Sequence, residues 1–113
     1  MIEVKIDANY LLKLAGKDKD FVVGILDDFG DSATDQIKEL HTQITPVVQL
    51  ETIRTILHRL KGSSSSLGMV SLSLVFVEME NWTSDQWQRG KGDINLLIEH
   101  LKESLRLCRQ VLK

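Results

Sequence analysis

Residues 56–68 read Ile56-Leu57-His58-Arg59-Leu60-Lys61-Gly62-Ser63-Ser64-Ser65-Ser66-Leu67-Gly68. Clusters of glycine and serine usually mark loops and flexible connectors. The apolar residues around this cluster instead recur with the period of a helix, on a face that also passes through Ser64: Leu50, Ile53, Leu57, Leu60 and Leu67. The spacing therefore predicts a helix that continues through the serines.

His58 is expected on the outer side of this helix. With about 100° of turn per residue, it lies roughly 130° from the middle of the apolar face, with Gly62 one turn beyond it and Arg54 one turn before it. Lys61 and Ser65 lie slightly nearer the apolar face. A glycine inside a helix costs about 1 kcal/mol relative to alanine, so Gly62 either ends the helix or leaves room beside the imidazole. Because the apolar face continues past Gly62, we favour room for an approaching molecule.

The composition is that of one globular domain spanning residues 1–113, since 42% of the residues are apolar and 27% are charged. No stretch approaches the roughly 20 apolar residues that span a bilayer, and Met1–Lys5 lacks the pattern of a secretory signal. The single cysteine, Cys108, cannot form an internal disulfide, which agrees with a reducing compartment. We therefore expect a cytoplasmic protein, either independent or a piece of a larger one.

Several classes of function are not expected. A net charge of −2 and an aromatic content of 5% offer no broad basic surface for nucleic acid, so a protein partner is favoured. His41 and His100 have no histidine, cysteine or carboxylate at a convincing ligand spacing, which argues against a metal site. No Gly-x-Ser-x-Gly motif accompanies the serines, which argues against a serine nucleophile.

The first three helices are predicted from their apolar period and their end signals. Asp7 is the expected N-cap of a short helix over residues 8–15, and Asp18 is the expected N-cap of a long second helix whose apolar face extends to Ile44. The third helix is expected to start at Pro46, because proline is tolerated in the first turn of a helix.

A turn at residues 67–69 is expected to lead into a fourth helix. Residues 87–93 are expected to form the longest loop, and Asp93 is the expected N-cap of the last helix. No segment shows the sustained alternation of a strand. We therefore predict an all-α fold, an antiparallel four-helix bundle with a short additional N-terminal helix.

The same turn places a carboxylate near His58. His58 lies eleven residues before Met69 and Glu80 lies eleven residues after it, so a helical hairpin brings the two to a similar height. There Glu80 could hold one ring nitrogen of His58 and leave the other exposed as a nucleophile. Geometry alone leaves an ordinary solvated Glu80 equally open, and a lone exposed histidine is more often a plain surface residue.

The spacing of these residues resembles the signature of histidine-containing phosphotransfer (Hpt) domains. Leucine, lysine and glycine follow His58 by two, three and four residues, the Leu67-Gly68 pair by nine and ten, Leu72 by fourteen and Glu80 by twenty-two. Outside residues 54–82 the resemblance is only in the helical layout. Similar domains are helical bundles whose histidine accepts a phosphoryl group from the aspartate of one receiver domain and passes it to another.

The resemblance implies a role for each residue of the site. His58 would be phosphorylated, Lys61 would pair with the phosphoryl group, and Glu80 would hydrogen-bond the imidazole. Gly62 would admit the receiver, and three neighbours are expected to contribute to binding: Arg54, Arg59 and Ser65. No cofactor or metal is implied for this chain, because Mg²⁺ would belong to the acidic pocket of the receiver.

The resemblance also implies the partners. The chain would be a monomeric phosphocarrier rather than an enzyme, and would exchange phosphate with response-regulator receiver domains, including that of a hybrid sensor histidine kinase. The receiver is expected to dock over the third and second helices, with Tyr10 or Leu14 contributing from the first. Two other functions stay open: a docking or adaptor module that carries no phosphate, and the phospho-accepting domain of a larger histidine kinase.

Two residues depart from the usual family pattern. Met69 stands where alanine is common, and Phe76 stands where a small residue or cysteine is common. Both are expected to change packing within the hairpin of the third and fourth helices.

Overall fold

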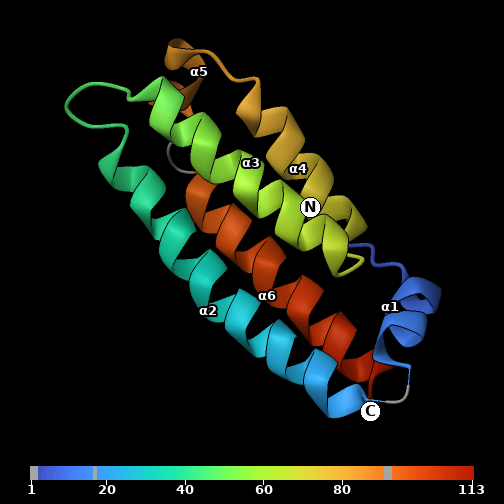
Figure 1. Cartoon of the computed structure of the whole chain (residues 1–113). Coiled ribbons are helices and arrows are strands. Elements are labelled where there is room, and N and C mark those ends of the chain that lie inside the picture. Colours follow the sequence, from blue (N-terminus) through green and yellow to red (C-terminus); the bar gives the residue numbers. More distant parts are fainter. Residues whose placement is uncertain (1–2, 17, 91–92) are drawn as a thin grey trace.

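The computed structural model describes residues 3–16, 18–90 and 93–113, and within them six helices and no strand. The four long helices are α2 (Lys19–Thr42), α3 (Leu50–Ser66), α4 (Val70–Glu80) and α6 (Asp93–Val111). They run alternately up and down the molecule, which confirms the predicted antiparallel four-helix bundle (Figure 1). The two short helices, α1 (Ala8–Ala15) and α5 (Ser84–Arg89), lie at opposite ends of the bundle (Figure 1).

An apolar core joins the helices. α3 packs chiefly on α4, α2 packs chiefly on α6, and α1 contacts both α2 and α6. A Cβ at Gly30 of α2 would stand 2.9 Å from Cδ1 of Leu105, so the missing side chain permits the close approach of α6. Met69 and Phe76 are both completely buried, which shows that the larger side chains at these positions fill the core. None of the described helices is long and apolar enough to cross a membrane.

The predicted starts of the first two helices are confirmed. Oδ1 of Asp7 accepts a hydrogen bond from the backbone N–H of Tyr10 at 3.0 Å, and Oδ1 of Asp18 accepts one from the backbone N–H of Phe21 at 2.9 Å. Each carboxylate satisfies an N–H group that has no partner within its own helix, and such a cap typically stabilises a helix by about 1 kcal/mol.

The serine run extends α3, as the apolar spacing predicts. The hydroxyl of Ser64 donates to the carbonyl of Leu60 at 2.8 Å, and the hydroxyl of Ser66 donates to the carbonyl of Gly62 at 2.9 Å. Each hydroxyl thus finds a partner one turn back in the same helix. Ser64 can therefore be completely buried without leaving its hydroxyl unsatisfied.

The end of α3 is a Schellman turn. The backbone N–H of Met69 donates to the carbonyl of Ser64 at 3.0 Å, and the N–H of Gly68 donates to the carbonyl of Ser65 at 3.1 Å. Gly68 has a φ of 74°, in the left-handed region that favours glycine. A Cβ there would also stand 3.2 Å from the ring of Tyr10, so this position needs glycine for two reasons. The predicted turn at residues 67–69 is confirmed.

The predicted start of α3 at Pro46 is wrong, because the helix begins at Leu50. The chain reverses direction first, and the backbone N–H of Gln49 closes this loop by donating to the carbonyl of Gln43 at 2.7 Å. Pro46 lies inside the loop. The fixed φ of proline suits a loop turn as well as the first turn of a helix, so a proline alone does not distinguish a loop from a helix start.

The predicted long loop at residues 87–93 is wrong over its first residues, which belong to α5. The signal was present in the sequence: Thr83 and Gln86 form a reciprocal capping box, in which the side chain of each accepts a backbone N–H of the other. Trp87 of α5 is completely buried. Lys91 and Gly92 of the expected loop lie outside the described residues. Asp93, expected as an N-cap, is the first residue of α6.

The segment before α1 is anchored to α4 and α6. The backbone N–H of Lys5 donates to Oγ of Ser71 at 2.8 Å, and the backbone N–H of Ser71 donates to the carbonyl of Lys5 at 3.2 Å. Oγ of Ser71 also lies 2.9 Å from Nε2 of His100, which is buried. Burial lowers the pKa of His100 from its ordinary value, because the charged ring would lose hydration.

We expect the fold to lose stability as the pH falls through the titration range of His100. In the unfolded chain His100 takes up a proton at about pH 6.5, whereas in the folded chain burial opposes protonation. The contribution of neutral His100 to the free energy of unfolding is therefore complete above that pH and declines as the pH falls below it. Denaturant unfolding of the wild type and of His100→Gln should show the wild type losing stability relative to the variant under acidic conditions. A stability difference that does not change with pH would contradict this assignment.

Candidate phosphotransfer site

His58 lies on the outer face of α3 and contacts Glu80 of α4. Nδ1 of His58 lies 3.3 Å from Oε1 of Glu80, and the two side chains are 67% and 26% exposed. The difference in exposure matters because the imidazole is open to a partner while the carboxylate is partly enclosed. The structure thus brings together two residues that are 22 positions apart in the sequence.

This contact gives the two ring nitrogens of His58 different roles. A carboxylate beside Nδ1 favours the tautomer with the proton on Nδ1, which leaves the lone pair on Nε2. The same carboxylate stabilises positive charge on the ring if Nε2 forms a new bond. The arrangement therefore leaves Nε2 as the ring nitrogen that is able to act as a nucleophile.

Arg54 and Arg59 lie beside this pair. Together with Glu51 and Thr55 they line a shallow depression around His58 and Glu80. Nε of Arg54 donates to the backbone carbonyl of Glu80 at 3.2 Å. Arg54 thereby caps the C-terminal end of α4. Because Arg54 lies one helical turn before His58, this bond also ties Glu80 to the part of α3 that carries His58. No local sequence pattern predicts this contact, because it depends on how two helices pack.

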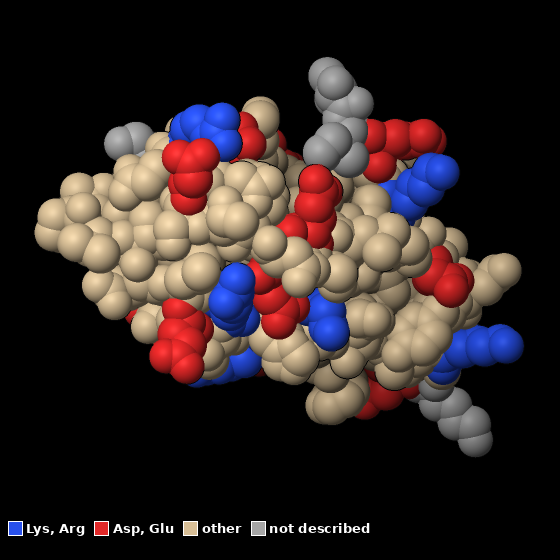
Figure 2. Space-filling view, turned by 90° about the horizontal axis from the view of Figure 1, so that it is seen from above, with Lys and Arg blue, Asp and Glu red and all other residues tan. Residues whose placement is uncertain are grey.

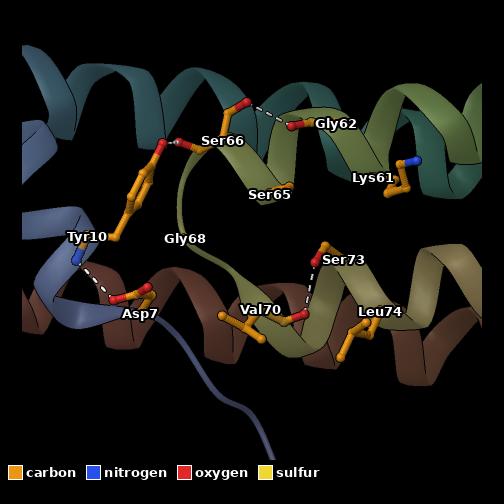
Figure 3. A pocket seen from close by; sticks show the side chains of 10 residues that line it. All are labelled: Asp7, Tyr10, Lys61, Gly62, Ser65, Ser66, Gly68, Val70, Ser73 and Leu74. Carbon is orange, nitrogen blue, oxygen red and sulfur yellow. Dashed lines mark hydrogen bonds between the residues drawn. The ribbon is translucent and has the colours of Figure 1, made fainter.

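Lys61, Gly62 and Ser65 lie along a second hollow, which runs between α3 and α4 (Figure 3). The hollow has a volume of about 630 Å³. One end is closed by Tyr10 of α1, whose hydroxyl donates to the carbonyl of Ser66 at 3.0 Å. Within the described part of the chain, Lys61 forms no ion pair with a carboxylate. Its ammonium group is available to an anion that approaches His58.

Gly62 neither ends α3 nor allows a tight contact within the chain. The helix continues for four residues beyond it, and a Cβ added at this position would meet no atom within 4 Å. Gly62 differs in this respect from Gly30 and Gly68, where packing excludes a side chain. The space beside His58 is therefore open to solvent.

Charge around the site is mixed, because the carboxylates of Glu51 and Glu80 lie in the same depression as Arg54 and Arg59. Figure 2 shows acidic and basic side chains interspersed over the face seen from above, among larger uncharged areas. Among the described residues, no group of three or more histidine, cysteine, aspartate or glutamate side chains is arranged to hold a metal ion. The local cations of the site are Arg54, Arg59 and Lys61.

Comparison with known families identifies the family of the chain that carries this site. The family model described as Hpt domain matches residues 24–110. The chain belongs to the Hpt domain family. The match covers the helices that carry His58, Lys61 and Glu80, and Hpt domains are phosphocarrier modules of histidine phosphotransfer in two-component and phosphorelay signalling. Searches of curated proteins and of solved structures gave no match.

Replacing Glu80 should slow phosphotransfer without abolishing it. We expect Glu80→Ala to reduce the rate at which His58 is phosphorylated by about tenfold, because Nδ1–H loses its partner while the nucleophile stays in place. Glu80→Gln should fall between the wild type and Glu80→Ala, because an amide oxygen still accepts a hydrogen bond but carries no charge. Single-turnover kinetics measures the three rates, and complete loss of transfer in Glu80→Ala would contradict a positioning role.

Filling the space at Gly62 should impair receiver access but not folding. Glutamine is a better helix former than glycine, so Gly62→Gln should raise the free energy of unfolding by about 0.5 kcal/mol. Transfer from a receiver should nevertheless slow, because the new side chain stands beside the imidazole. Gly24→Gln in α2 is the matched control, since a Cβ at Gly24 also meets no atom within 4 Å. Equal transfer rates for the two variants would show that space at Gly62 does not matter.

Proposed function

We propose that this Hpt domain is the intermediate carrier of a phosphorelay, which takes a phosphoryl group from the aspartate of one receiver domain onto Nε2 of His58 and passes it to another. The observation that carries the proposal is the 3.3 Å contact between Nδ1 of His58 and Glu80, combined with the exposure of the imidazole. An enclosed histidine could not meet two partner proteins in turn.

The transfer requires one bond to form and one to break. The lone pair of Nε2 attacks the phosphorus of the aspartyl phosphate, the phosphorus–oxygen bond to the aspartate breaks, and the aspartate leaves as a carboxylate. Positive charge develops on the ring, where Glu80 stabilises it through Nδ1–H. The reverse of these steps returns the phosphoryl group to the aspartate of a second receiver.

The residues around His58 supply positioning and charge. Phosphoryl transfer depends mainly on holding the reacting atoms in line and on neutralising the oxygens of the phosphoryl group. The ammonium group of Lys61, one helical turn from His58, is suited to pair with those oxygens. We assign the Mg²⁺ of the reaction to the receiver, whose aspartate carries the phosphoryl group at the start of the step.

The partners we propose are response-regulator receiver domains, including that of a hybrid sensor histidine kinase. We place the reaction in the cytoplasm, because the single cysteine, Cys108, agrees with a reducing compartment. Burial raises the pKa of the Cys108 thiol to about 11, so this residue is not a reactive thiolate at neutral pH.

Phosphorylation of His58 is tested with a labelled, phosphorylated receiver. The wild type should acquire a label that is lost in acid and kept in alkali, as expected for phosphohistidine, and His58→Gln should acquire none. His41→Gln is the control, because it removes an exposed histidine from α2. Labelling that persists in His58→Gln would overturn the assignment. Binding of receivers without transfer would indicate an adaptor, and labelling by a kinase domain alone would indicate a kinase-fed domain.

A further inference from the structure

Arg54 of α3 bonds to the last carbonyl of α4. An α-helix leaves its last four carbonyls without a partner inside the helix. In α4, Asn81 and Trp82 donate to the first three of them, the carbonyls of residues 77–79, at 3.0 to 3.1 Å. The fourth is the carbonyl of Glu80, and its donor is Nε of Arg54 at 3.2 Å. The end of α4 is therefore held by a side chain of a neighbouring helix as well as by the turn that follows.

Glu80 consequently contacts α3 at two points. Its carbonyl points toward the C-terminal end of α4 and meets Arg54, whereas its side chain leans back toward the N-terminal end and meets His58. Because α4 runs antiparallel to α3, these two contacts fall one turn apart on α3, where Arg54 precedes His58 by four residues. The bond from Arg54 thus fixes the backbone from which the carboxylate reaches the imidazole.

The contact between Glu80 and His58 tolerates little movement of that backbone. The two atoms that meet, Oε1 and Nδ1, are already 3.3 Å apart, and a hydrogen bond is largely lost beyond roughly 3.5 Å. Glu80 is also the last residue of α4, and helices fray at their ends. A loosened Glu80 would release Nδ1 and let the ring adopt the tautomer with its proton on Nε2, which has no lone pair there for the phosphorus.

We infer that Arg54 is a positioning residue for phosphotransfer: it holds Glu80 against α3 and, through Glu80, keeps the proton of the neutral His58 ring on Nδ1. This inference rests on the proposed function, because it concerns the nucleophile of that reaction. It places Arg54 among the groups that orient His58, whereas the sequence alone suggests a contribution to binding. Arg59 lines the same depression, but within the described part of the chain it makes no hydrogen bond to Glu80.

Arg54→Met and Arg59→Met are matched variants that test the inference. Methionine keeps an unbranched side chain and a similar helix propensity, but it removes the charge and every N–H donor. Both arginines are exposed, so both variants should fold. Glu80→Ala shows the result of losing the carboxylate altogether. Long-range ¹H–¹⁵N NMR of the unphosphorylated proteins in mildly alkaline solution, where imidazoles are neutral, reports the tautomer, and His58→Gln identifies the signals of His58.

We expect the ring of His58 to carry its proton on Nδ1 in the wild type and in Arg59→Met. In Arg54→Met the population with the proton on Nε2 should rise at least about twofold, toward that of Glu80→Ala. A role of Arg54 in helix stability alone would not change this tautomer equilibrium. A wild-type tautomer in Arg54→Met, or an equal change in Arg59→Met, would overturn the inference.

Labelling of His58 by phosphoramidate, a small phosphoryl donor that needs no receiver, tests whether Arg54 acts through Glu80. Arg54→Met should slow labelling by about threefold in the wild-type background and by less than about 1.5-fold in the Glu80→Ala background, because the carboxylate that Arg54 positions is then absent. Equal slowing in the two backgrounds would show that Arg54 acts on the phosphoryl group directly, and the inference would fail.

A receiver assay separates this inference from the proposed function. If receivers fail to transfer to the wild type while Arg54→Met changes the tautomer, the phosphorelay proposal fails and the positioning role of Arg54 stands. If receivers transfer to the wild type and the tautomer does not depend on Arg54, the phosphorelay proposal stands and the positioning role fails.

Discussion

The turn at the end of α3 is the constraint on which the site depends. The N–H groups of Met69 and Gly68 bond back to the carbonyls of Ser64 and Ser65, and Gly68 adopts the left-handed conformation that this turn requires. These bonds direct α4 back along α3 with a defined register. His58 and Glu80 consequently meet across the hairpin, although each is about three helical turns from Met69. A change in the length of the turn would separate the nucleophile from the carboxylate that orients it.

Much of this arrangement could be predicted from local sequence rules. The apolar spacing through Ser64 predicts that α3 continues through the serines, and the structure shows why the serines are tolerated: their hydroxyls bond to carbonyls one turn back. Asp7 and Asp18 act as caps because a carboxylate there reaches an N–H group only three residues away. Counting residues on either side of the turn places Glu80 at the height of His58, but it leaves an ordinary solvated Glu80 equally open, and the structure shows the contact between them.

The features that could not be predicted depend on packing or on ambiguous signals. Arg54 reaches the carbonyl of Glu80 across 26 residues of sequence, and Tyr10 reaches the carbonyl of Ser66 across 56, so neither contact has a local pattern. Pro46 suits both a turn and a helix start. The capping box of α5 was readable at Thr83, but glycines close behind it favoured a loop.

The structure presents a nitrogen of His58 and the carboxylate of Glu80 beside the cations Arg54, Arg59 and Lys61. On our account the remaining chemistry comes from the partners. The most direct test of this arrangement is the position of the phosphoryl group on the ring. Long-range ¹H–¹⁵N NMR of the phosphorylated protein distinguishes the two imidazole nitrogens. Because Glu80 holds Nδ1, the phosphoryl group should be on Nε2 of His58. A phosphoryl group on Nδ1, or on another histidine, would contradict the role of the His58–Glu80 pair.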